Sequence, residues 1–141
     1  MPRERIKILI ADDDSEDLEL IEEHILMVEP VAQLHKFTDG SSAYAYLSSQ
    51  ADGELPSLMI LDYNMPGLNG AELLAKLKKS SRYASVPKII LSTSNVAQYI
   101  EESLNNGATE YIVKPHSMKE MTELAKKFVA LAMQINHSIG R

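Results

Sequence analysis

Five short apolar stretches alternate along this chain with five longer segments in which apolar residues recur at helical spacing. The expected strands cover residues 6–11, 31–37, 57–62, 87–92 and 109–113, and the expected helices cover residues 15–28, 40–50, 69–80, 96–106 and 117–135. Short apolar runs bounded by polar residues are typical of buried strands in a parallel sheet. The alternation therefore predicts an α/β domain with helices on both faces of the sheet.

The composition narrows the class of protein. A length of 141 residues fits one domain with a substantial core, and a net charge of −6 argues against a surface for nucleic acid or anionic membranes. The chain has no cysteine, no run of transmembrane length, and no room for a signal peptide before residue 6. We expect a cytoplasmic protein with a single domain at 1–141, a core at about 6–135, and no second, output domain.

Acidic residues follow two of the expected strands at the point where each strand ends. Asp12 and Asp13 come directly after the first strand, and Asp62 ends the third. The carboxyl ends of parallel strands meet at one edge of the sheet, where ligands bind. Because three ionised carboxylates repel one another, a shared pocket requires a cation. The pattern predicts a hard divalent metal, most simply Mg²⁺.

The ends of two further expected strands carry groups that suit an anion held at such a metal. Lys114 follows an apolar run near the C-terminus, and its ammonium can bind a phosphoryl oxygen as a point charge. Ser92 ends the fourth strand with a hydroxyl that can donate a hydrogen bond. Acid pair, lone acid, hydroxyl and lysine together are far more specific than any of them alone.

These residues and the loops around them resemble the receiver domain of two-component response regulators. The matching residues are Asp12-Asp13, residues 62–70 (DYNMPGLNG), Ser92 and residues 107–115 (GATEYIVKP). The resemblance runs from Lys7 to about Leu131. It implies a flavodoxin-like (βα)5 fold, a doubly wound five-stranded parallel sheet with strand order 2-1-3-4-5. The sequence of residues 91–94 (LSTS) is most similar to that of single-domain regulators paired with phytochrome-type histidine kinases.

The resemblance also implies a role for each residue. Asp62 is the phosphoacceptor, and Lys114 and Ser92 bind the transferred phosphoryl oxygens. The metal ligands are Asp12, Asp13, Asp62 and the backbone carbonyl of Asn64. Tyr111 is a switch aromatic that moves together with Ser92, which alters the surface formed by the fourth helix, fifth strand and fifth helix. The family further implies a cis peptide bond between Lys114 and Pro115.

The resulting expectation is a stand-alone signalling domain that is not an enzyme in the usual sense. A sensor histidine kinase or a histidine phosphotransfer protein would supply the phosphoryl group. The phosphorylated domain would then bind a downstream protein, form a homodimer, or pass its phosphoryl group to another histidine. No nucleic acid or membrane is expected as a partner.

Three other functions compete with this interpretation. A metal-dependent phosphohydrolase usually needs a second acid two residues after its aspartyl nucleophile, where this chain has Asn64. A degenerate receiver that only binds partners would have lost an acid or Lys114, and none is lost. A flavodoxin-like cofactor protein would need a phosphate-binding loop after the first strand, where this chain has acids.

Each residue taken singly also has an ordinary structural explanation. The acids at 12–14 could cap a helix, Asp62 could start a turn, and Lys114 could be a solvated charge. Ser92 and Tyr111 could be core or edge residues. We further expect Asn95 to cap the fourth helix, Val96, Ile100 and Leu104 to form its apolar stripe, His24 and Tyr99 to be exposed, and Met118, Met121 and Met133 to pack in the core.

Overall fold

The computed structural model describes residues 5–139, and their side chains as far as residue 134. It contains a five-stranded parallel sheet in the order β2-β1-β3-β4-β5. The strands are β1 (Lys7–Ala11), β2 (Gln33–Phe37), β3 (Leu58–Leu61), β4 (Lys88–Ser92) and β5 (Glu110–Val113). The helices are α1 (Ser15–Val28), α2 (Gly40–Ser49), α3 (Gly70–Lys78), α4 (Ala97–Asn105) and α5 (Met118–Ile139). Both the predicted fold class and the predicted strand order are confirmed.

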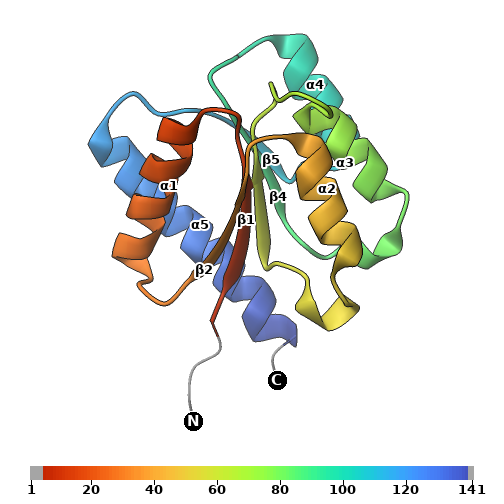
Figure 1. Cartoon of the computed structure of the whole chain (residues 1–141). Helices are drawn as coiled ribbons and strands as arrows, with labels where there is room; N and C mark the ends of the chain where they lie inside the picture. The colour runs from red at the N-terminus through yellow and green to blue at the C-terminus, as the bar shows by residue number, and fades with distance from the viewer. Residues whose placement is uncertain (1–4, 140–141) are drawn as a thin grey trace.

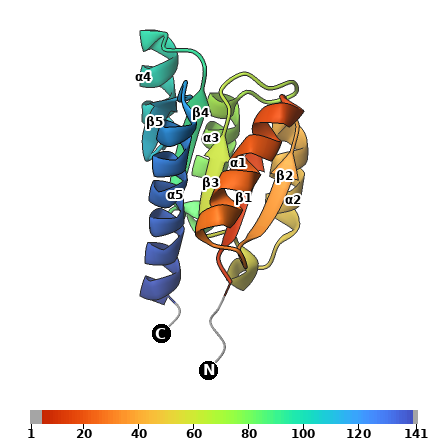
Figure 2. The same cartoon turned by 90° about the vertical axis from the view of Figure 1, so that its left-hand side faces the viewer.

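The helices form a layer on each face of the sheet. Helices α1 and α5 cover one face, and α2, α3 and α4 lie on the other (Figures 1 and 2). Successive side chains of a strand point to opposite faces, so each buried strand contributes to two separate cores. Ile8, Ile10 and Ile60 face α1 and α5, whereas Leu9 and Leu61 face α2 and α3. The strands are apolar on both faces because both faces are covered.

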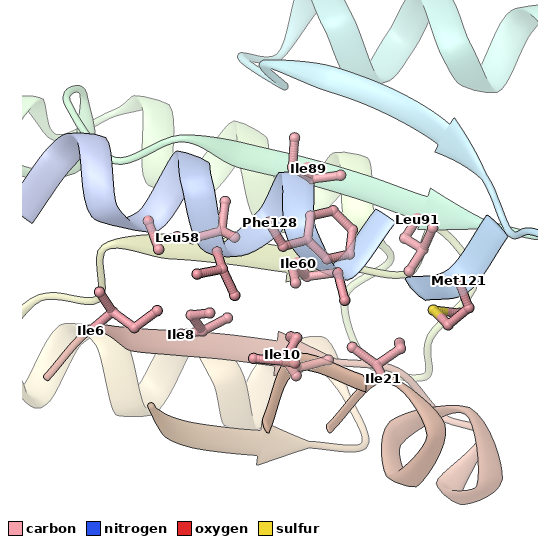
Figure 3. Close-up of a cluster of buried hydrophobic side chains, with 14 of the residues drawn as sticks. Ile6, Ile8, Ile10, Ile21, Leu58, Ile60, Ile89, Leu91, Met121 and Phe128 are labelled. Atoms are coloured by element: carbon pink, nitrogen blue, oxygen red, sulfur yellow. The ribbon is translucent and has the colours of Figure 1, made fainter. Parts of the chain in front are cut away.

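The core between the sheet and helices α1 and α5 is closed by Phe128. This side chain is fully buried and lies against Ile60 of β3 (Figure 3). On α5, Met121 and Phe128 are buried, and Leu124, Leu131 and Met133 are half-buried beside them. Ile135 and His137 lie outside the residues whose side chains are described.

Helix α4 lies where the sequence predicts it, and Ile100 is half-buried, but most of its side chains face other directions than expected. Val96 and Leu104 are 44% and 47% exposed, whereas Ser103 is fully buried and Tyr99 is half-buried. The helix begins one residue later than expected, so its N-cap is Val96 and Asn95 does not cap it. The polar side chain of Ser103 can face inward because its hydroxyl donates to the Tyr99 carbonyl, 2.7 Å away.

Two other side chains also lie where the sequence did not place them. His24 is 8% exposed, since its Nδ1 lies 2.9 Å from the Leu20 carbonyl in the preceding turn. Met118 is 62% exposed at the start of α5, whereas Met121 packs in the core as expected. Within residues 5–139 no helix is both long and apolar enough to span a membrane.

The loop between β3 and α3 is held against the start of α2. The amide of Gly40 donates to the Pro66 carbonyl at 3.4 Å, and a Cβ on Gly40 would lie 2.1 Å from the Leu68 oxygen. Glycine is therefore required at this close approach. At the other end of the loop, Asn69 and Glu72 form a reciprocal capping box that starts α3. Both contacts fix the loop that follows Asp62.

Candidate functional site

The aspartates predicted to share a pocket do meet at the carboxyl edge of the sheet. Asp12 and Asp62 follow the neighbouring strands β1 and β3, which pair up to Ala11 and Leu61. One carboxylate oxygen from each of Asp12, Asp13 and Asp62 lies within 4.8 Å of the others. Asp12 and Asp62 are buried, and Asp13 is exposed. Oxygen donors at this spacing fit a hard cation such as Mg²⁺ that keeps several waters.

Lys114 joins this group from the end of β5. Its Nζ lies 2.8 Å from Asp12 Oδ2, 2.7 Å from Asp17 Oδ2 and 3.4 Å from Asp62 Oδ2. Its amide donates to the Ser92 carbonyl at 2.8 Å, so the pairing of β5 with β4 aims the side chain. No peptide bond within residues 5–139 is cis, so the expected cis Lys114–Pro115 bond is wrong. The lysine reaches the pocket through a trans bond.

The consecutive aspartates Asp12 and Asp14 have different roles. Asp14 caps α1, accepting from the amides of Glu16 and Asp17 at 2.9 and 3.3 Å. Asp12 accepts from the Asp14 amide at 2.9 Å and turns its other oxygen to Lys114. Helix capping was the alternative explanation for the whole acidic run, and it is correct for Asp14 alone.

Asp17 is a member of the site that the sequence did not reveal. It lies in the first turn of α1, where an acid is favoured by the helix dipole and attracts no notice. Asp13 precedes the N-cap of α1, so the spacing of the two acids gave no signal that they share a site. Only the packing of α1 against α5 showed that Lys114, which lies between β5 and α5, is its partner.

Burial and the neighbouring charges of the pocket shift the pKa values of Asp12 and Lys114. Burial raises the pKa of Asp12 to about 6 from the ordinary 3.8, although Lys114 and the Asp14 amide oppose the increase. Burial alone would lower the pKa of Lys114, but its bonds to Asp12 and Asp17 raise it above the ordinary value. The lysine therefore stays charged, and Asp12 is the carboxylate that a proton can neutralise near neutral pH.

We expect Mg²⁺ binding to weaken steeply below pH 6, because a proton on Asp12 competes with the metal. The folded pKa lies above the unfolded value, so the metal-free protein takes up a proton as the pH falls through about 6. Above that pH the buried charge of Asp12 lowers the free energy of unfolding, and this loss is regained as the pH falls from about 6 toward 3.8. Titrations with Mg²⁺ followed by tyrosine fluorescence should show about a tenfold loss of affinity per pH unit below the pKa. Asp12→Asn should bind more weakly without this dependence, and a flat wild-type profile contradicts the prediction.

Ser92 ends β4 and Tyr111 lies within β5, and both bond to Ser94 in the loop that follows β4. Ser92 is fully buried, and its Oγ accepts from the Ser94 amide at 3.3 Å. Tyr111 is half-buried, and its hydroxyl donates to the Ser94 carbonyl at 2.7 Å. Movement of either side chain therefore bears on Ser94. Asn64 is exposed in the loop after β3.

Tyr63, the residue after Asp62, contacts helix α4, and the sequence did not reveal this contact either. Its ring stacks on Tyr99 with centroids 4.2 Å apart and planes at 13°. Its hydroxyl donates to Glu102, and burial together with this bond raises the pKa of Tyr63. The stacking on Tyr63 explains why Tyr99 is half-buried, although the sequence predicted that it would be exposed.

Comparisons with known sequences agree with the geometry. Residues 8–126 match the model of the response regulator receiver domain. The response regulator ARR8 of Arabidopsis thaliana is 31% identical over 135 residues, covering 85% of this chain and 59% of the plant protein. This chain thus spans about three fifths of such plant relatives. The probable methanogenesis regulatory protein FilR2 of Methanothrix harundinacea is 25% identical, covering 94% of this chain and 87% of FilR2.

Solved structures give the same result. The phosphorylated cyanobacterial phytochrome response regulator RcpA superposes with a TM-score of 0.83 at 26% identity, covering 92% of this chain and 95% of RcpA. The Mn²⁺-bound response regulator Rcp1 has a TM-score of 0.74 at 27% identity, covering 86% of this chain and 90% of Rcp1. With the acidic pocket, the lysine and the sheet order already in place, these matches show that the chain belongs to the response regulator receiver domain family.

Proposed function

We propose that Asp62 is the residue of this receiver domain that accepts a phosphoryl group. Receiver domains are phosphoacceptor signalling modules of two-component systems rather than conventional enzymes, which removes the phosphohydrolase alternative. The observation that carries the proposal is the position of Asp62. Its buried carboxylate lies within 4.8 Å of two further carboxylates and 3.4 Å from the ammonium of Lys114. A nucleophilic carboxylate needs this balance of charge beside an incoming phosphate.

Receiver domains bind Mg²⁺ at an acidic pocket of this kind. We infer that Asp12, Asp13, Asp62 and the backbone carbonyl of Asn64 hold it here. The bound ion offsets the repulsion between the carboxylate and the phosphoryl group. The Mn²⁺ bound by Rcp1, a relative of similar fold, supports a divalent ion in this pocket.

The chemistry of the chain's own residues then follows. An oxygen of Asp62 attacks phosphorus, the bond from phosphorus to the donor histidine breaks, and its electron pair returns to the imidazole. Lys114 and the hydroxyl of Ser92 bind the oxygens of the transferred group. Water later hydrolyses the acyl phosphate and restores the carboxylate. The donor belongs to a sensor histidine kinase or a histidine phosphotransfer protein, as the plant response regulators and FilR2 support.

The signal leaves the site through the loop that joins β4 to α4. Phosphorylation adds about −1.5 to −2 charge, which draws Ser92 toward the phosphoryl group and releases Tyr111 from Ser94. The altered surface is formed by α4, β5 and α5. Apolar side chains on or beside these elements are at least 40% exposed, namely Val96, Leu104, Val113 and Met118. An exposed set of this kind suits a downstream protein or a second copy of the chain.

The same reasoning covers the setting of the domain. We propose that residues 1–141 form a single receiver domain that acts in the cytoplasm, and the match to RcpA over 95% of the RcpA chain supports the single-domain assignment. A phytochrome-type histidine kinase is the kinase class that the RcpA match supports.

Phosphate incorporation tests the proposal directly. Incubation with acetyl phosphate and Mg²⁺ is expected to add one phosphoryl group to the wild type, measured by intact mass, and EDTA should prevent it. Asp62→Ala should take up none. Asp52→Ala, which removes an exposed carboxylate outside the site, should behave as the wild type. Incorporation of a phosphoryl group by Asp62→Ala would contradict the proposal. A change in the size-exclusion elution volume of the wild type on phosphorylation would identify self-association as the output.

A further inference from the structure

We propose that Asp17 is a positioning residue that holds the Lys114 ammonium in the unphosphorylated protein and competes for it with the phosphoryl group. The inference rests on the function proposed for Asp62 and Lys114. It concerns the one acid of the pocket that neither holds the metal nor accepts phosphate.

The distances show where the ammonium is committed. Asp17 Oδ2 lies 2.7 Å from Lys114 Nζ, which is shorter than the 3.4 Å to Asp62 Oδ2. An ammonium has three donors, and Asp12, Asp17 and Asp62 together can occupy all of them. A phosphoryl oxygen that arrives on Asp62 therefore competes with these carboxylates for the three donors of the ammonium.

Asp17 is the carboxylate that can be displaced. Among the described residues, the acids close enough to share one ion are Asp12, Asp13 and Asp62, so Asp12 has a second task and Asp17 does not. The Asp17 side chain is 32% exposed and that of Asp12 is 2% exposed. Returning a half-exposed carboxylate to water costs much less than leaving a buried one unpaired. The fixed start of α1 also keeps Asp17 in place after the lysine has moved, because its amide donates to Asp14.

An ion pair present before phosphorylation and absent after it stabilises only the unphosphorylated state. Such a contact slows the gain of a phosphoryl group and opposes its retention. Asp17 therefore sets how readily this receiver is phosphorylated without touching the reacting atoms. Neutralising it should release Lys114 to the phosphoryl group.

Asp17→Asn tests the inference, with Glu16→Gln as the matched control. Glu16 is the preceding residue, carries the same charge, is exposed, and is not among the carboxylates that Lys114 contacts. At an Mg²⁺ concentration saturating for each variant, Asp17→Asn should be phosphorylated by acetyl phosphate about threefold to tenfold faster than the wild type, as expected for one partly buried ion pair. Glu16→Gln should change the rate by less than about 1.5-fold, because a charge with no direct contact is screened.

A binding measurement without turnover provides the second readout. Beryllofluoride with Mg²⁺ mimics the phosphoryl group, and tyrosine fluorescence can follow it because Tyr63 adjoins Asp62 and the chain has no tryptophan. Asp17→Asn should bind it more tightly than the wild type by a factor similar to the gain in rate. The inference is overturned if Asp17→Asn is neither faster nor tighter, or if Glu16→Gln gains as much. A wild type that takes no phosphate on Asp62 contradicts the proposed function instead, so the two failures are distinguishable.

Discussion

Lys114→Met should destabilise the metal-free protein by about 2–4 kcal/mol and strengthen its binding of Mg²⁺ roughly tenfold. The lysine is the cation shared by Asp12, Asp17 and Asp62, and its side chain is only 12% exposed. Its removal leaves these carboxylates facing one another without a counter-charge, which a divalent ion can then supply. The same change removes the positive charge that repels the metal. Stability lost in EDTA should thus be largely recovered in Mg²⁺.

Urea unfolding in EDTA and in excess Mg²⁺ measures both effects. The matched control is Lys127→Met, since Lys127 makes an equally short pair of 2.7 Å with Glu110 while both side chains are 43% exposed. Exposed pairs contribute little, so this variant should change stability by less than about 1 kcal/mol with or without Mg²⁺. Equal losses in the two variants would mean that the burial of Lys114 has no energetic consequence.

Phe128→Ala should cost about 3–5 kcal/mol of unfolding free energy. The ring projects from α5, is fully buried, and packs in the same core as Ile60 and Ile89 of the sheet (Figure 3). Alanine would remove its apolar contacts and leave a cavity, because a rigid sheet and a long helix cannot close around the gap. A lower urea midpoint with an unchanged slope is the expected result.

The only other phenylalanine of the chain gives the control. Phe37 ends the edge strand β2, is half-buried, and lies 5.2 Å from the ring of Tyr46 between centroids. Because water can fill the space it leaves, Phe37→Ala should cost roughly 1–2 kcal/mol. If the two substitutions cost the same, the α5 core does not dominate the stability of the fold.

Much of the fold could be predicted because it follows from local patterns. Runs such as residues 58–61 are apolar at every position, which a strand covered on both faces requires, and the end of each predicted element agrees with the structure to within two residues except at α5. The bounds of helix α4 were predicted, but the side of the helix that faces the protein was not. Its apolar residues suggested a buried stripe, but the side of a helix that faces the protein also depends on what lies beneath it. Here Tyr63 and the hydroxyl bond of Ser103 turn Tyr99 and Ser103 inward.

The sequence by itself determined the strand ends, and so it identified Asp12, Asp13, Asp62, Ser92 and Lys114 as neighbours at one edge of a parallel sheet. That inference needs only the period of the apolar residues and the rule that parallel strands end together. The tertiary structure alone decided the partners of these residues. Asp17 meets Lys114, and Tyr63 meets Glu102, across 97 and 39 positions of the chain. Contacts of this kind depend on how a helix is rotated and docked against the sheet, which no local pattern encodes.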